Sequence, residues 1–138
     1  MTSFVEWLEN NLFTTIILNG DKLGLTVGVY IKKNYLILRL KGELDDVTVS
    51  DLRMKISKYL DEYNIKHLII NVKELSFLDS SGIGFIIGRY HQLRRNAGDI
   101  SIVCMNPKVE RIILLSGLTK ICMIRENEDV CINALGGY

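Results

Sequence analysis

The sequence has few of the residues that signal a disulfide-bonded, metal-binding or secreted protein. Its three cysteines, Cys104, Cys122 and Cys131, form no C-x-x-C pair, and an odd number cannot all pair within one chain. Neither a zinc site nor a disulfide framework is indicated, and this usage fits a cytoplasmic protein in a reducing compartment. The N-terminus shows no basic segment of the kind that opens a signal peptide, so none is expected.

Charge of one sign and long apolar runs are also missing. Lysine and arginine together number 17, aspartate and glutamate 16, and the net charge is +1. Because neither sign dominates, the composition does not favour nucleic acid or an anionic membrane as a partner. No apolar run is long enough to cross a bilayer. We therefore expect no nucleic-acid and no membrane partner.

The residue combinations of a hydrolase are absent as well. The G-x-S-x-G elbow does not occur, because Leu78 stands two residues before Ser80 where that motif has glycine. The only histidines are His67, at the start of a predicted strand, and His91, well along a predicted helix. Neither is placed to act as a base for Ser80. The sequence therefore predicts a protein that is not an enzyme.

Three glycines of one predicted helix resemble a nucleotide-binding loop only in part. Gly82, Gly84 and Gly88 have a third spacing that is one residue too long for G-x-G-x-x-G, and the Walker lysine is missing. Contact with a helix or with another protein explains these glycines better. We expect no cofactor and no bound metal.

The length of 138 residues and a hydrophobic content of 48% predict one globular domain. Asn19–Lys22 reads as a turn or linker, which divides an N-terminal extension of residues 1–22 from a domain of residues 23–138. We expect the extension to be dispensable. Its apolar residues favour either a short amphipathic helix or a loosely packed segment, since they recur at helical spacing: Phe4, Leu8, Leu12 and Ile16.

Strand and helix patterns alternate along the remaining chain. Apolar runs predict strands over 25–31, 35–42, 66–72, 99–105 and 121–124. Amphipathic patterns with start and stop signals predict helices over 47–63, 81–96, 106–115 and 126–135. This order predicts a single α/β domain in which about four helices pack over a mixed β-sheet.

The chain is organised around Leu75–Gly84, which reads LSFLDSSGIG and passes from an apolar strand into a helix. Asp79, Ser80 and Ser81 are the residue types that cap helix N-termini. An exposed serine hydroxyl at such a terminus is also well placed to carry a phosphate, because free N–H groups favour an anion there. Gly82 and Gly84 remove side chains where another surface could approach.

A second strand-to-helix junction lies at Asp45 and Asp46. Because functional turns gather at the carboxyl ends of parallel strands, Asp45 and Ser80 are expected to share one edge of the molecule. Two interpretations of the acidic residues stay open at this point. Either Asp45 or Asp46 caps the following helix, or these two and their neighbours Glu43 and Asp79 hold a metal ion.

The motif at 75–84, followed by Gly88-Arg89-Tyr90, resembles the signature of anti-sigma factor antagonists of the STAS family, and the sporulation type most closely. The likeness extends over residues 24–135. It includes similar motifs at three further places: Gly42–Asp45, Asn106-Pro107 and Ser116–Leu118.

This resemblance implies a STAS fold and a role in partner switching. The unphosphorylated protein would bind an anti-sigma factor that is also an ATP-dependent serine kinase, and so release a sporulation sigma factor of the sigma-F type. The kinase would phosphorylate Ser80 and switch the antagonist off, and a serine phosphatase would reset it. The resemblance also implies that Asp45 touches the same partner. With the residues of the serine turn, the expected partner contacts are Asp45, Asp79, Ser80, Ser81, Gly82, Ile83 and Gly84.

The sequence departs from the family pattern at two places. Asp46 stands where a histidine often follows the aspartate, and the first twenty or so residues have no counterpart. Two other functions remain open: a stress-response antagonist of the same family, and a STAS domain that binds a small ligand or nucleotide.

Overall fold

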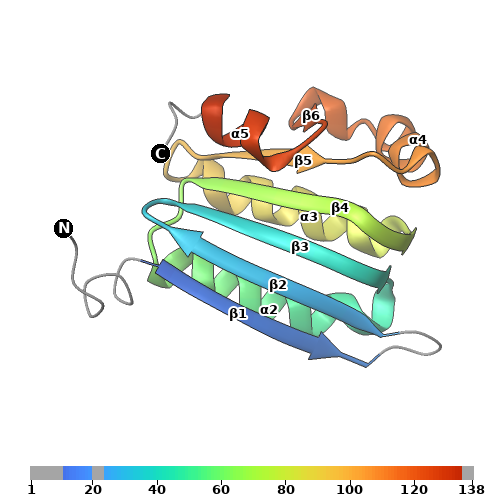
Figure 1. Ribbon diagram of the computed structural model, residues 1–138, viewed down its shortest axis with the longest axis horizontal. Coiled ribbons are helices and arrows are strands. Elements are labelled where there is room, and N and C mark those ends of the chain that lie inside the picture. Colours follow the sequence, from blue (N-terminus) through green and yellow to red (C-terminus); the bar gives the residue numbers. More distant parts are fainter. Residues whose placement is uncertain (1–10, 20–23, 135–138) are drawn as a thin grey trace.

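The computed structural model describes residues 11–19 and 24–134, and its centre is a six-stranded sheet in the order β1-β2-β3-β4-β5-β6 (Figure 1). β1, β2 and β3 pair antiparallel, whereas β3 to β6 pair parallel. The strands are β1 (Asn11–Leu18), β2 (Leu25–Lys32), β3 (Tyr35–Leu44), β4 (His67–Leu78), β5 (Asp99–Val103) and β6 (Met123–Arg125).

Helices cover both faces of this sheet. In Figure 1, α2 and α3 lie behind the sheet and α5 lies in front of it. The helices described are α2 (Asp46–Glu62), α3 (Ser80–Arg94), α4 (Pro107–Ser116) and α5 (Glu128–Ala134), together with one 3₁₀ turn over Leu118–Lys120. The predicted mixed α/β domain is confirmed. The predicted strand over 121–124 is shifted, because the 3₁₀ turn takes up the chain just before it.

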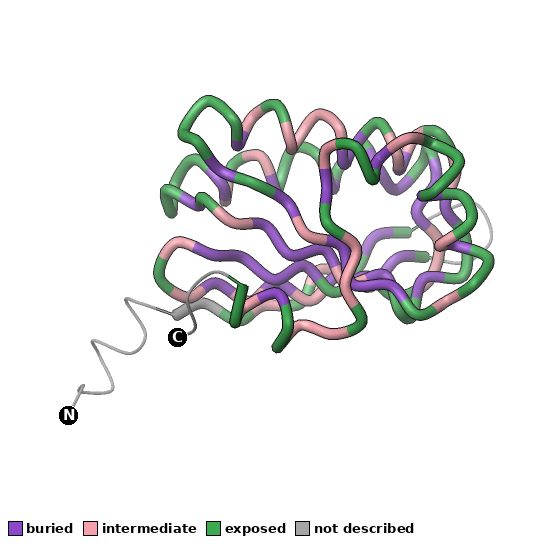
Figure 2. Tube along the Cα trace, turned by 90° about the horizontal axis from the view of Figure 1, so that it is seen from above, coloured by how far each residue is buried: buried purple, intermediate pink, exposed green. Residues whose placement is uncertain are grey.

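The core follows from the alternation of side chains along the strands. In β3, Leu36 and Leu38 point to the main core under α2 and α3, whereas Tyr35 and Ile37 join a smaller cluster on the α5 face. A strand covered on both sides needs apolar residues at consecutive positions, which explains the buried run YLIL at 35–38. Figure 2 shows the buried positions concentrated along the strands and on the inner sides of the helices.

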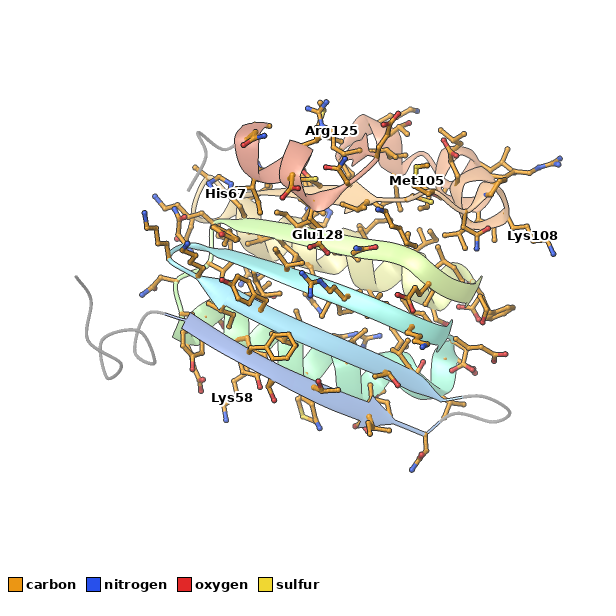
Figure 3. The ribbon with its side chains drawn as sticks, viewed as in Figure 1. Lys58, His67, Met105, Lys108, Arg125 and Glu128 are labelled. Carbon is orange, nitrogen blue, oxygen red and sulfur yellow. The ribbon has the colours of Figure 1, made fainter. Side chains whose placement is uncertain are left out.

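A cluster of Arg39, Asn71 and Glu128 connects α5 to the front of the sheet by hydrogen bonds. Figure 3 labels Glu128 near the centre of this face. Arg39 donates from Nε and Nη2 to the two Glu128 oxygens at 2.9 and 2.7 Å. Asn71 Nδ2 donates to Glu128 Oε2 at 2.8 Å. Burial raises the pKa of Glu128, but the hydrogen bonds from Arg39 and Asn71 outweigh it, so the pKa lies below its usual value.

The expectation of a helix or a loosely packed extension is wrong for residues 11–18. They form β1, which pairs with β2 at every position from Asn11↔Lys32 to Leu18↔Leu25. The four-residue step between Leu12 and Ile16 fits a helix face, but it equally places both residues on one face of a strand. Phe4 and Leu8 lie outside the described residues. Whether residues 1–22 are dispensable stays a prediction, and the paired strand argues against it.

Leu18 and Ile17 offer a matched test of how much β1 contributes to stability. Leu18 is 5% exposed and belongs to the core, whereas its neighbour Ile17 faces the other way and is 73% exposed. Leu18→Ala should lower the free energy of unfolding by about 2 kcal/mol or more, as for other buried leucines. In the monomer, Ile17→Ala should change it by less than about 0.5 kcal/mol. Urea unfolding measures both, and equally small losses would show that β1 adds little.

The Glu128 cluster predicts a pH dependence of stability. Because the pKa of Glu128 is lower in the folded protein, its contribution is present above the unfolded pKa of about 4.3 and disappears as pH falls through the folded pKa. Glu128→Gln should therefore destabilise the protein at neutral pH and make little difference in strong acid. Glu74→Gln is the control, since Glu74 forms an exposed 3.7 Å pair with Lys41. A pH-independent loss in Glu128→Gln would contradict this role.

Candidate functional site

Two strand-to-helix junctions lie side by side at one edge of the sheet. β3 and β4 pair in parallel up to their last residues, where Leu44 lies opposite Leu78. Asp45 follows the first strand and caps α2, and Asp79 follows the second and caps α3. The shared edge predicted from the sequence is therefore confirmed, and it lies at the carboxyl ends of parallel strands, where binding sites of α/β sheets form.

Asp45 is held inside its junction. It is 8% exposed, and its Oδ1 accepts from the backbone N–H groups of Val47 at 3.0 Å and Thr48 at 2.9 Å. Thr48 Oγ1 accepts in return from the Asp45 N–H at 3.1 Å, which completes a capping box. Asp45 is thus the cap of α2, and Asp46 is its exposed first residue. A partner can reach only a small part of the Asp45 carboxylate.

Asp79 shapes the turn that presents the serines. Its Oδ1 accepts from the backbone N–H of Ser81 at 2.9 Å and of Gly82 at 3.4 Å. Ser80 is the first residue of α3 and is exposed, whereas Ser81 is half-buried. Capping is therefore done by Asp79, and the Ser80 side chain is presented to solvent at the positive end of the helix.

The two glycines of the motif have different structural reasons. A Cβ on Gly82 would collide with Leu78 Cδ1 and come within 3.0 Å of Leu44 Cδ2. A Cβ on Gly84 would meet nothing within 4 Å, and Gly84 is exposed. The expectation that both glycines keep a surface open is therefore wrong for Gly82, which lets the first turn of α3 pack on the strand ends. Ile83 between them is half-buried against the core.

Three exposed apolar side chains lie at or just beyond the carboxyl ends of the strands at this edge. None of them was predicted from the sequence to be a site residue. Val47 in the first turn of α2 is 41% exposed, Phe77 near the end of β4 is 44% exposed, and Met105 beyond β5 is 59% exposed (Figure 3 labels Met105). A contiguous exposed apolar patch marks a protein-binding surface, so these three side chains are candidates for contact with a partner.

The other candidate chemistries gain no support at this edge. In residues 11–19 and 24–134, no three histidine, cysteine, aspartate or glutamate side chains lie close enough together to hold a metal ion. His67 lies at the opposite end of β4 from the serines, where its Nδ1 is 2.8 Å from Asp99 Oδ1. None of the described helices is long and apolar enough to cross a membrane.

Comparison with known proteins gives a family model and several relatives. The model of the STAS domain matches residues 26–131. An anti-sigma F factor antagonist of Paenibacillus polymyxa is 36% identical over 113 residues, which are 82% of this chain and 94% of that protein. One of Lysinibacillus sphaericus is 34% identical and covers 64% of this chain and 75% of its own length. An anti-sigma-B factor antagonist of Staphylococcus aureus is 21% identical, with 78% and 99% covered.

Solved structures agree with this assignment. The anti-sigma factor antagonist SpoIIAA in its unphosphorylated form matches with a TM-score of 0.69 at 28% identity, covering 92% of this chain and 99% of its own. The Bacillus cell fate determinant SpoIIAA in the phosphorylated form matches with a TM-score of 0.61 at 27% identity, covering 90% and 99%. The resemblance carried by the motif at 75–84 is confirmed, and the chain belongs to the STAS domain family.

Proposed function

We propose that this protein is an anti-sigma factor antagonist of the sporulation type, switched by phosphorylation of Ser80. The observation that carries the proposal is the exposed Ser80 at the first position of α3, beside the Asp45 junction. Relatives named anti-sigma F factor antagonists share 36% and 34% identity with the chain, against 21% for an anti-sigma-B antagonist. This difference favours a sigma-F system over a stress-response system.

The proposed cycle needs two partners in the cytoplasm. The first is an anti-sigma factor that is also an ATP-dependent serine kinase, which the unphosphorylated antagonist binds and thereby separates from its sigma factor. The second is a serine phosphatase that removes the phosphate from Ser80. A regulatory role without catalysis of its own fits relatives that are named as antagonists. The three cysteines are free and buried, which suits a reducing cytoplasm.

The partner would dock on the edge formed by the two junctions. The docking surface combines exposed Ser80 and Gly84 with the apolar side chains of Val47 and Phe77. Asp79, Ser81 and Ile83 are half-buried around it. Asp45 and Gly82 support this surface from beneath, and Asp45 adds the accessible part of its carboxylate.

A phosphate on Ser80 would change binding far more than folding. It adds a charge of about −1.5 to −2 at neutral pH. The N-terminus of α3 favours an anion, so the fold tolerates the modification. A close-fitting interface does not tolerate it, because a charge that loses water without gaining a partner costs more than about 1 kcal/mol. The half-buried Asp79 carboxylate beside Ser80 adds repulsion.

Variants of Ser80 test the switch directly. Incubation with candidate anti-sigma kinases and ATP, followed by mass spectrometry, should locate the phosphate on Ser80. Ser80→Ala should bind the kinase and stay unmodified, whereas Ser80→Asp should fold normally and bind at least about tenfold more weakly, which is about 1.4 kcal/mol. Ser81→Ala is the control and should be phosphorylated like the wild type. Phosphate on Ser81, or wild-type affinity of Ser80→Asp, would refute the mechanism.

Variants of Gly82 and Gly84 distinguish a residue that supports the docking surface from one that contacts the partner. Gly82→Ala should lower the free energy of unfolding by about 1–3 kcal/mol, because the methyl group is forced against Leu78 and Leu44. Gly84→Ala should leave stability equal or raise it by up to about 1 kcal/mol, since alanine is the better helix former. It should nevertheless weaken kinase binding, measured by calorimetry. Full binding by Gly84→Ala would place the interface elsewhere.

A further inference from the structure

β1 forms one edge of the sheet and lies outside residues 26–131, which the family model matches. On one side β1 pairs with β2, and on the other side it faces no strand within the described part of the chain (Figure 1, dark blue). The row of backbone N–H and C=O groups on that outer side is a template for another strand.

β1 lacks the features that usually protect an edge strand. Its sequence, NLFTTIIL, contains no charged residue and no proline, and its pairing with β2 runs through all eight positions without a bulge. The front face of the strand is exposed as well. Phe13 is 59% exposed, Ile17 is 73% exposed, and Thr15 between them is exposed. The edge therefore offers both unpaired backbone groups and an apolar stripe.

We propose that β1 is a self-association edge, on which β1 of a second copy of this chain pairs antiparallel across a two-fold axis. An uncharged strand pairs with itself without bringing like charges together. We place the two-fold axis at Thr15, so that most of the strand takes part in the pairing. Each odd-numbered residue then lies opposite an odd-numbered residue of the other copy, and each even-numbered residue opposite an even-numbered one. Side chains on the front face of one strand therefore meet front-face side chains of the other. Phe13 then faces Ile17 of the partner subunit, and Thr15 faces Thr15 of the partner subunit. Aromatic–β-branched and threonine–threonine pairs are favourable across antiparallel strands.

This edge is independent of the proposed kinase-binding surface. β2 separates β1 from β3, and the Ser80 junction lies at the ends of β3 and β4. Each subunit of the pair would keep its own docking surface accessible. A single strand pair buries less than the 1,200–2,000 Å² of a typical stable interface, so the association is reversible and depends on concentration.

Sedimentation velocity of the full chain over a wide concentration range tests the proposal. The wild type should pass from monomer to dimer. Thr15→Lys and Thr15→Glu should each weaken dimerisation at least tenfold, because like charges then meet at the axis. An equimolar mixture of the two should restore a dimer that contains one copy of each. Thr26→Lys is the control, since Thr26 is exposed on the front of β2, one strand in from the edge.

Circular dichroism and thermal unfolding establish that each variant is folded, and Ile17→Lys gives a second disruption on the same face if a Thr15 variant is not. A wild type that stays monomeric at its highest soluble concentration would overturn the proposal. So would a Thr15→Lys protein that dimerises like the wild type, or a charge-swapped mixture that stays monomeric. Phosphorylation of Ser80 in Thr15→Lys should match the wild type, so this test and that of the switch can fail separately.

Discussion

Parallel pairing of β3 with β4 positions every residue of the candidate site. Because Leu44 and Leu78 lie opposite each other at the strand ends, the next residue of each chain segment starts a helix at the same level. Aspartate at both places satisfies the free N–H groups of the first turns, so α2 and α3 begin side by side. Gly82 then fits against the same two leucines. The surface around Ser80 is therefore set by the main core.

This arrangement divides the motif into support and contact. Asp45 and Gly82 are buried, and changing them acts first on the junction itself. Ser80 and Gly84 are both exposed and lie one turn apart on the same face of α3, where added atoms meet solvent. A phosphate can thus alter what the surface binds without altering how the surface is built. In the proposed switch, a single charge at Ser80 therefore acts on binding rather than on the packing of the junction.

The sequence alone was enough to predict the helices and strands that have strong local signals. It was not enough where the structure of a segment depends on packing or pairing with other parts of the chain. Apolar runs and caps located β3, α2, β4 and α3, and the motif located Ser80. The reason for Gly82 could not be predicted from the sequence, because the collision with Leu78 and the close contact with Leu44 depend on how α3 packs on the ends of β3 and β4. β1 was misread because a four-residue step between apolar positions fits both periodicities. Only its pairing with β2 shows which one applies.

The position of β1 also explains how self-association could coexist with partner docking at the Ser80 edge without disturbing it. This sheet has its parallel strands and their carboxyl ends on one side of β3, and its antiparallel strands on the other. β1 extends the antiparallel side only, and a strand paired with its outer edge would leave the register of β3 with β4 unchanged. In the proposed scheme, the uncharged edge of β1 serves association, while the carboxyl edge carries the phosphorylation switch. Because different hydrogen bonds maintain the two edges, selection can change either one alone.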